Sequence, residues 1–148
     1  MAVNREELIT CLNDLIETCR DAELGFRTAA EHAENGHLKI YFDRLSSQRA
    51  QFGSELKAEV RQLGGNANES GSVSGTFHRG WMNLKSAVTG GDVSIISECE
   101  WGEDAALHNY ERVLSQNLPP NVLPVVKHQY TQIKDAHNRI RGMEKRAA

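Results

Sequence analysis

Four carboxylates lie close together near the middle of the chain, in the stretch Glu98-Cys99-Glu100-Trp101-Gly102-Glu103-Asp104. Acids at this density can bind a metal ion or transfer protons. Glu103 falls on the apolar stripe of the surrounding segment, whose other members are Ile96, Cys99, Ala106, Tyr110 and Val113. Because burial of an unpaired carboxylate is costly, an inward acid requires a partner, a proton or a metal. Glu103 is therefore the leading candidate for a site residue among the four acids, and Glu100 lies at the margin of the stripe.

Polar residues interrupt the apolar patterns of three other segments as well. Glu23 lies on the inward side of the first segment. Gln48 and Arg49 stand where the second segment should be apolar, and His137 lies on the stripe of the last. Interruptions of this kind occur at functional sites and in buried polar networks. These residues can act with Glu103 only if the elements that carry them bring them to one place.

Apolar residues at three- and four-residue spacing predict four long helices. The predicted helices cover about residues 4–34, 37–63, 93–116 and 121–145. Asn4 is expected to cap the first helix and Asp92 the third, whereas Gly64-Gly65 ends the second. Four helices of this length predict an all-α fold, a four-helix bundle formed by one domain over residues 1–148.

The connection between the second and third helices, residues 64–91, decides the topology. It is predicted to contain a short helix at about 76–89, in which Trp81 anchors the helix against the bundle. A simple up-down bundle would need only a short loop here. A connection of this length can instead cross the whole bundle, since a helix of ~28 residues is ~42 Å long. The length favours an up-down-down-up order, with the second and third helices parallel.

The crossover topology places the interrupting residues at one height. Glu23 lies ~28 Å along the first helix, and counting along the second and third helices reaches Gln48 and Glu103 at that level. His137 comes within one turn of it, whereas an up-down bundle would place Glu103 about a turn or more lower. We therefore predict a buried polar layer made of Glu23, Gln48, Arg49, Glu103 and His137.

One interpretation of this layer is a metal site. Carboxylate-bridged centres use a Glu from each of two helices and a Glu-x-x-His pair from each of the other two. Neither Gln48-Arg49-Ala50-Gln51 nor Lys134-Asp135-Ala136-His137 supplies such a pair, so a complete di-iron site is not expected. A reduced site for iron, manganese or zinc would use side chains that these metals prefer, namely Glu23, Glu100, Glu103 and His137.

The other interpretation, which we favour, is a core layer without metal. Arginine is the residue best suited to a buried bidentate carboxylate pair. Arg49 would then neutralise Glu23 or Glu103, and Gln48 would supply hydrogen bonds.

The composition excludes several classes of function. The net charge of −3 argues against the basic face of a nucleic-acid-binding protein. No apolar run approaches the ~18 residues of a membrane span, and Met1-Ala2-Val3-Asn4 lacks the order of a signal peptide, so a cytoplasmic location is expected. Cys11, Cys19 and Cys99 form no Cys-x-x-Cys pair, which predicts buried apolar side chains rather than a zinc site or disulfides.

A combination of motifs spread over nearly the whole chain allows comparison with a known family. The motifs are Leu12-Asn13-Asp14-Leu15-Ile16-Glu17-Thr18-Cys19-Arg20-Asp21, Gly25-Phe26, Gln48-Arg49, Glu55-Leu56, His78-Arg79-Gly80-Trp81 and the acidic stretch 98–104. Together they resemble an uncharacterised bacterial family, a domain of unknown function whose four-helix bundles are similar to the ferritin-like superfamily. The resemblance implies a ferritin-like bundle of bacterial, cytoplasmic origin and brings no established activity.

The resemblance also bears on the metal ligands. The ligands of the broader superfamily carry over only to Glu23, to Glu103 and, less directly, to His137. Gln48 departs from the ligand expected on the second helix, which argues against oxidase or iron-storage chemistry.

Two functions from different classes are therefore carried forward. The first is a structural, stress-associated or interaction protein without enzymatic activity, built around a buried polar layer. The alternative is a metal-binding bundle with a redox or iron-handling role. Pairing of two chains through a helix face is compatible with either, whereas nucleic-acid and membrane partners are not expected.

Overall fold

The computed structural model describes residues 3–67, 81 and 84–147, and the regular structure in this part of the chain is entirely helical. Four long helices dominate it: α1 (Arg5–His32), α2 (Gly36–Gln62), α5 (Gly91–Leu114) and α6 (Leu123–Ala147). Their ends differ from the predicted bounds by no more than two residues. The prediction of an all-α chain with four long helices is confirmed.

The connection between α2 and α5 is described only in part. It contains the four-residue helix α4 (Leu84–Ala87) and, directly after it, the 3-10 turn η2 (Val88–Gly90). The first half of the short helix predicted at about 76–89 falls largely outside the described residues. Within the described part of the chain, no helix has the length and apolar character needed to cross a membrane.

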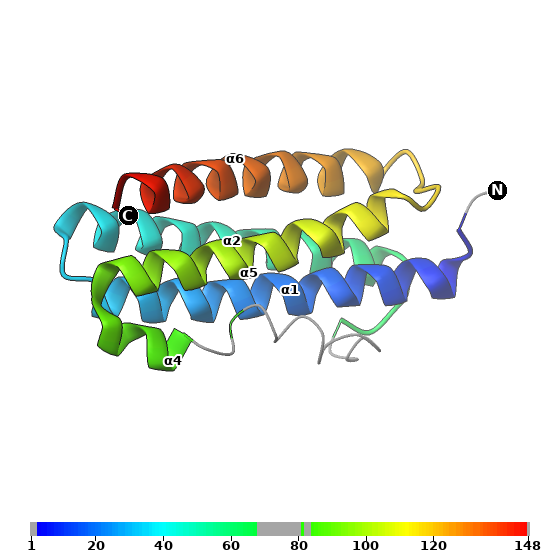
Figure 1. Cartoon of the computed structure of the whole chain (residues 1–148). Coiled ribbons are helices and arrows are strands. Elements are labelled where there is room, and N and C mark those ends of the chain that lie inside the picture. Colours follow the sequence, from blue (N-terminus) through cyan, green and yellow to red (C-terminus); the bar gives the residue numbers. More distant parts are fainter. Residues whose placement is uncertain (1–2, 68–80, 82–83, 148) are drawn as a thin grey trace.

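The four long helices lie side by side with their axes roughly parallel or antiparallel (Figure 1). α1 runs from right to left in this view, and α2 returns from left to right. α5 starts again at the left and runs in the same direction as α2, and α6 runs back to the left. The end of α2 and the start of α5 therefore lie at opposite ends of the bundle (Figure 1).

The helix ends follow from local chemistry. Asn4 caps α1, because its side-chain oxygen accepts a hydrogen bond of 2.8 Å from the N–H of Glu7. At the end of α2, Gly64 adopts a φ of 78°, and the N–H of Gly65 donates to the carbonyl of Val60. This pattern is a Schellman motif. Glycine is favoured at its left-handed position because a Cβ atom would be crowded there.

Asp92 does not cap α5, so that prediction is wrong. The residue at the N-cap is Gly90, and Asp92 lies in the first turn. Its carboxylate instead accepts hydrogen bonds from the backbone N–H groups of Glu34 (2.8 Å) and Asn35 (3.0 Å), in the turn between α1 and α2. Asp92 thus joins the start of α5 to the α1–α2 turn.

The core consists of two apolar clusters, one toward each end of the bundle. The first includes Leu12, Leu56, Tyr110, Val126 and Ile133. The second includes Phe26, Phe42, Ile95, Cys99 and Ile140. Along α2 and α5 the change from one cluster to the other falls at Arg49 and Glu103, which are 1% and 0% exposed. A charged pair therefore separates the two halves of the core.

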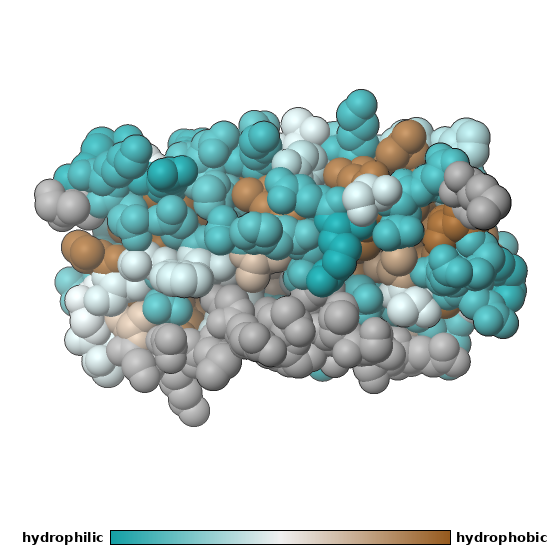
Figure 2. Space-filling model, turned by 45° about the vertical axis from the view of Figure 1, so that its right-hand side comes forward, coloured by the Kyte–Doolittle hydropathy of each residue, from teal (hydrophilic) through white to brown (hydrophobic). Residues whose placement is uncertain are grey.

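Polar residues predominate on the described part of one face of the molecule (Figure 2). Figure 2 shows hydrophilic side chains over most of one face, with hydrophobic residues showing between them. Among the described residues the exposed large hydrophobic side chains are Leu24, Ile40, Val93, Trp101 and Leu123. They are spread over all four long helices, and hydrophobic residues that are exposed singly need no special explanation.

Candidate functional site

Arg49 on α2 and Glu103 on α5 form a bidentate ion pair at the centre of the bundle. The Nη2 atom of Arg49 donates to Oε2 of Glu103 at 2.6 Å, and its Nη1 atom donates to Oε1. Both carboxylate oxygens are therefore occupied by one guanidinium group. The geometry is that of parallel N–H···O bonds, the strongest arrangement between these two side chains.

Neighbouring side chains complete the environment of the guanidinium group. Its Nε atom donates to Oε1 of Gln48 at 3.1 Å, and its central carbon lies 5.3 Å from the centre of the Phe26 ring. Burial lowers the pKa of Arg49, but the adjacent Glu103 carboxylate raises it, and the net pKa is above its ordinary value. Arg49 is thus a permanent cation whose charge Glu103 balances.

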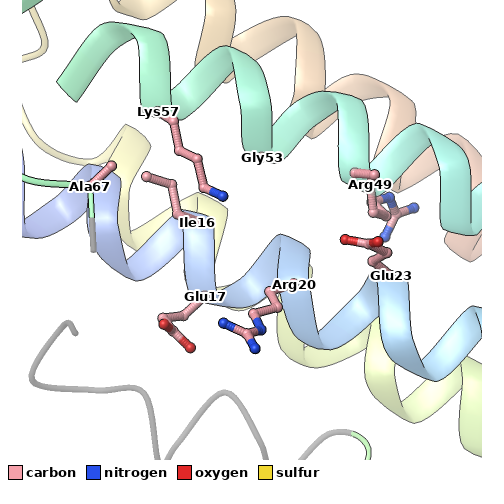
Figure 3. Close-up of a pocket in the computed structure, with 9 residues that line it drawn as sticks. Ile16, Glu17, Arg20, Glu23, Arg49, Gly53, Lys57 and Ala67 are labelled. Atoms are coloured by element: carbon pink, nitrogen blue, oxygen red, sulfur yellow. The ribbon is translucent and has the colours of Figure 1, made fainter. Parts of the chain in front are cut away.

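Glu23 does not share the buried pair. Its carboxylate accepts a hydrogen bond of 2.8 Å from Arg27, one turn further along α1, and its side chain is 27% exposed. Glu23 and Arg49 line the same cavity of ≈ 240 Å³ between α1 and α2 (Figure 3). The predicted layer is therefore split, with Glu23 at the surface edge and Glu103 in the core.

His137 and Glu100 face a second cavity, of ≈ 480 Å³, between α5 and α6. His137 is 9% exposed, and its Nε2 atom lies 3.7 Å from Oδ1 of Asp104. Glu100 shares a hydrogen bond with Glu144 on α6, and this contact, together with burial, raises the pKa of Glu100 to about 7. These residues form a polar groove beside the core, whereas the Arg49 guanidinium group donates its hydrogen bonds to Gln48 and Glu103.

The four residues predicted as metal ligands thus fall in three places, with Glu100 and His137 sharing the groove between α5 and α6. Glu103 is bound by Arg49, Glu23 by Arg27 and Glu100 by Glu144, while His137 lies near Asp104. Among the residues that the structure describes, no three His, Cys, Asp or Glu side chains converge as a metal ion would require.

A second buried polar cluster was not predicted. The Tyr110 hydroxyl donates to Oε1 of Gln129 at 2.7 Å and lies 3.1 Å from the Cys19 sulfur. The side-chain amide of Gln129 donates to the carbonyl of Phe52 (3.2 Å) and to the Glu55 carboxylate (3.0 Å). This chain of hydrogen bonds links all four long helices and lies within the first apolar cluster, beside the ion pair.

The position of Gln129 was open to prediction from the pattern. It lies three residues after Val126 and four before Ile133, so it belongs on the inward stripe of α6. Tyr130, four residues after Val126, fits the same stripe by its spacing. Tyr130 is only partly buried, and its hydroxyl donates to Glu111 at 2.7 Å on the outer side of the α5–α6 pair.

The buried cysteines are poor nucleophiles. Burial raises the pKa of Cys19 to about 11, despite the hydrogen bond to Tyr110, and burial also raises the pKa of Cys99. Because the thiolate is the reactive form of cysteine, both side chains remain protonated thiols at neutral pH. They act as small packing residues of the core.

Comparison with known proteins identifies a family. The family model described as "Domain of unknown function (DUF2383)" matches residues 7–116, more than half of the chain. The matched residues contain α1, α2, the connection and α5, including both members of the ion pair. No curated protein sequence matches the chain.

Proposed function

The chain belongs to the family of this domain of unknown function, and on that premise we propose that it is a structural, stress-associated or interaction protein without enzymatic activity. In this proposal it is a bacterial, cytoplasmic, ferritin-like bundle with an up-down-down-up helix order. A buried arginine supplies the positive charge that a metal ion supplies in metal-binding bundles of this architecture.

The bidentate contact between Arg49 and Glu103 carries the proposal. Carboxylate-bridged metal centres lie between facing helices in the middle of such bundles. At this position the chain has one inward carboxylate, and one guanidinium group takes both of its oxygens. A metal ion would have to displace a well-oriented cation from a site with almost no solvent exposure.

The helix directions support the ferritin-like part of the proposal. α2 and α5 run in the same direction and are joined by a connection that crosses the bundle (Figure 1). A four-helix bundle with one long crossover of this kind is the arrangement of ferritin-like folds. The bacterial and cytoplasmic assignments rest on the motif resemblance given above.

Metal content tests the proposal directly. Protein purified without chelator is analysed for iron, manganese and zinc, and its melting temperature is measured with and without each divalent ion. We expect less than stoichiometric metal and no stabilisation, since binding to the folded state alone would raise the melting temperature. Pairing of two chains is a separate prediction, checked by the molar mass in solution.

The metal-binding alternative predicts a specific opposite result. Stoichiometric metal that is lost in Glu103→Ala and His137→Ala, and retained in the surface variant Glu34→Ala, would replace the proposal with a metal site at the predicted ligands. Glu34 serves as the matched control because its side chain is exposed in the turn between α1 and α2.

A further inference from the structure

Trp81, in the connection between α2 and α5, lies against two glycines from different helices. A Cβ atom added to Gly25 on α1 would lie 2.3 Å from Cε3 of Trp81. A Cβ atom added to Gly102 on α5 would lie 2.2 Å from Cε2. Both distances are far below van der Waals contact, so any larger residue at either position would collide with the indole. The ring therefore lies directly on the backbones of α1 and α5.

Aromatic contacts connect the indole with the buried ion pair. Trp81 meets the Phe26 ring edge to face, with the ring centres 5.0 Å apart and the planes at 73°. The Phe26 ring also contacts the guanidinium group of Arg49, whose central carbon lies 5.3 Å from the ring centre. Gly102 directly precedes Glu103 in the chain. One aromatic ring thus separates Trp81 from the pair.

The two glycines call for an explanation. Both lie inside long helices, where glycine is destabilising relative to alanine because its unfolded backbone has more freedom to lose. Neither has a positive φ, so neither serves a turn. Their common feature is that both lie against the indole ring of Trp81. Their lack of a side chain leaves a flat recess between α1 and α5 that fits a planar aromatic group.

We propose that Gly25 and Gly102 form an aromatic seat, and that Trp81 occupies it as an intramolecular ligand. Occupation of the aromatic seat fixes the connection between α2 and α5 to the bundle and covers the Phe26 side of the ion pair. The class of group that fits the aromatic seat is a planar aromatic ring such as indole. The proposal does not depend on whether the bundle binds metal.

Proteolysis of the connection tests the first part of the proposal. The connection contains Arg79, a trypsin site two residues before Trp81. In Trp81→Ala and in Gly102→Ala we expect cleavage there to accelerate about tenfold, because its rate follows the population of the open form. Trp101→Ala is the matched control, since Trp101 is 65% exposed.

Rescue by free indole tests the second part. In Trp81→Ala the aromatic seat is empty, so millimolar indole should bind there and raise the melting temperature. Cleavage after Arg79 should stay fast, because free indole is not joined to the connection. In the double variant Trp81→Ala/Gly102→Ala the new Cβ atom fills part of the aromatic seat, so indole should have no effect. Wild-type protein should not respond either, since Trp81 already occupies the recess.

General destabilisation is distinguished by a variant in the other half of the core. Val60→Ala removes methyl groups from a side chain that is 0% exposed and far from the aromatic seat, and it leaves a cavity too small for indole. It should lower the melting temperature without a response to indole. If Trp81→Ala does not fold, Trp81→Phe keeps a ring in the recess, and Gly102→Ala alone decides the proteolysis result.

Two results would overturn the proposal. The first is cleavage of Trp81→Ala and Gly102→Ala at the wild-type rate, since Trp81 would then not hold the connection. The second is an effect of indole on the Trp81→Ala/Gly102→Ala double variant equal to that on Trp81→Ala, because binding would then occur elsewhere.

Discussion

Arg49 and Glu103 are buried away from solvent, so the net contribution of their ion pair to stability depends on the geometry of the contact. Moving two charges out of water costs several kcal/mol per ion, and attraction in the low-dielectric interior returns it only when hydrogen bonds are well placed. Here two parallel bonds, a bond to Gln48 and the Phe26 ring satisfy the guanidinium group. The two opposite charges neutralise each other, and loss of either side chain would leave the other charge buried without a partner.

Single and paired substitutions should therefore differ in how much stability they cost. We expect Glu103→Ala or Arg49→Ala alone to lower the free energy of unfolding by about 3–5 kcal/mol, because a buried charge is left without its partner. The double variant Arg49→Met/Glu103→Leu should recover most of this loss, since it removes both charges and keeps the volume. Urea denaturation of the four proteins measures the values. A double variant no more stable than the single ones would contradict the balance.

The Glu100–Glu144 contact makes a prediction about pH. Its hydrogen bond raises the pKa of Glu100 from 4.5 to about 7, so the folded protein binds this proton more tightly than the unfolded chain. The free energy of unfolding should therefore fall as the pH rises from 4.5 toward 7. The same bond lowers the pKa of Glu144, whose contribution is lost only below its ordinary value of 4.5.

The Glu144→Gln variant removes the shared proton and should flatten this profile. Because both side chains are only partly buried, the effect is at most ~1 kcal/mol, or about 2–4 °C in melting temperature. Thermal melts at pH 5 and pH 7.5 compare the two proteins. An equal slope in both would show that another group titrates in this range.

The sequence allowed a polar layer to be expected, but its pairing was decided in three dimensions. Glu103 and Arg49 could be placed inward because they replace apolar residues in strong helical patterns. Glu23 has the same signal, yet Arg27, one turn away, draws its carboxylate to the surface. Sequence spacing gives the height of a residue along a helix, whereas the rotation of the helix and nearby charges decide which partner it meets.

At the level of elements, Asp92 connects two parts of the chain that are far apart in sequence. A residue before a helix with a short polar side chain is usually a cap, which is why the sequence indicated one. In the structure the side chain binds the turn between α1 and α2 instead. Local patterns carry no information about such a partner, because it is supplied only when the helices pack.

Asp92→Ala should therefore destabilise the joint between the α1–α2 turn and α5. Two hydrogen bonds to a charged acceptor at a partly exposed site are worth about 1–3 kcal/mol together. Asp92→Asn, which keeps one acceptor oxygen, should lose about half as much. Asp43→Ala on the exposed face of α2 is the control, and it should remain within ~0.5 kcal/mol of the wild type. Urea denaturation gives the three differences, and an Asp92→Ala value equal to that of the control would contradict this role.

The long helices themselves were the most predictable part of the structure, and their connection was the least. Apolar residues repeat over many turns in α1, α2, α5 and α6, with few polar interruptions, so the bounds of these helices followed from the pattern. The connection has no such repeat. Trp81 was expected to anchor it, but its contact with Gly25 and Gly102 could not be foreseen, because these glycines are 77 residues apart in the chain.

At the scale of the whole molecule, the bundle consists of two helical hairpins. α1 and α2 are joined by a turn of three residues, and α5 and α6 are joined by a short loop. Along the chain, the two hairpins are connected by the long segment between α2 and α5 (Figure 1). Contacts within each hairpin are local in sequence, and contacts between the hairpins are not. Local contacts form early because little loop entropy is lost in closing them.

This arrangement predicts the order of folding. The hairpins should form first and dock second, so bonds that join α2 to α5 should appear late. In Glu103→Ala we expect the unfolding rate to rise in proportion to the lost stability, with a folding rate close to that of the wild type, which corresponds to a φ-value near 0. Stopped-flow folding in urea measures both rates. A folding rate that falls with stability would place the pair in the early nucleus.

The separation of the core by one ion pair then has a kinetic meaning. Two apolar hairpin faces can adhere in several registers, since hydrophobic attraction has no preferred direction. Only one register brings the guanidinium group of Arg49 onto the Glu103 carboxylate; every other one traps two dehydrated, unmatched charges. The ion pair therefore destabilises misaligned arrangements of the two hairpins, so that these dissociate and dock again.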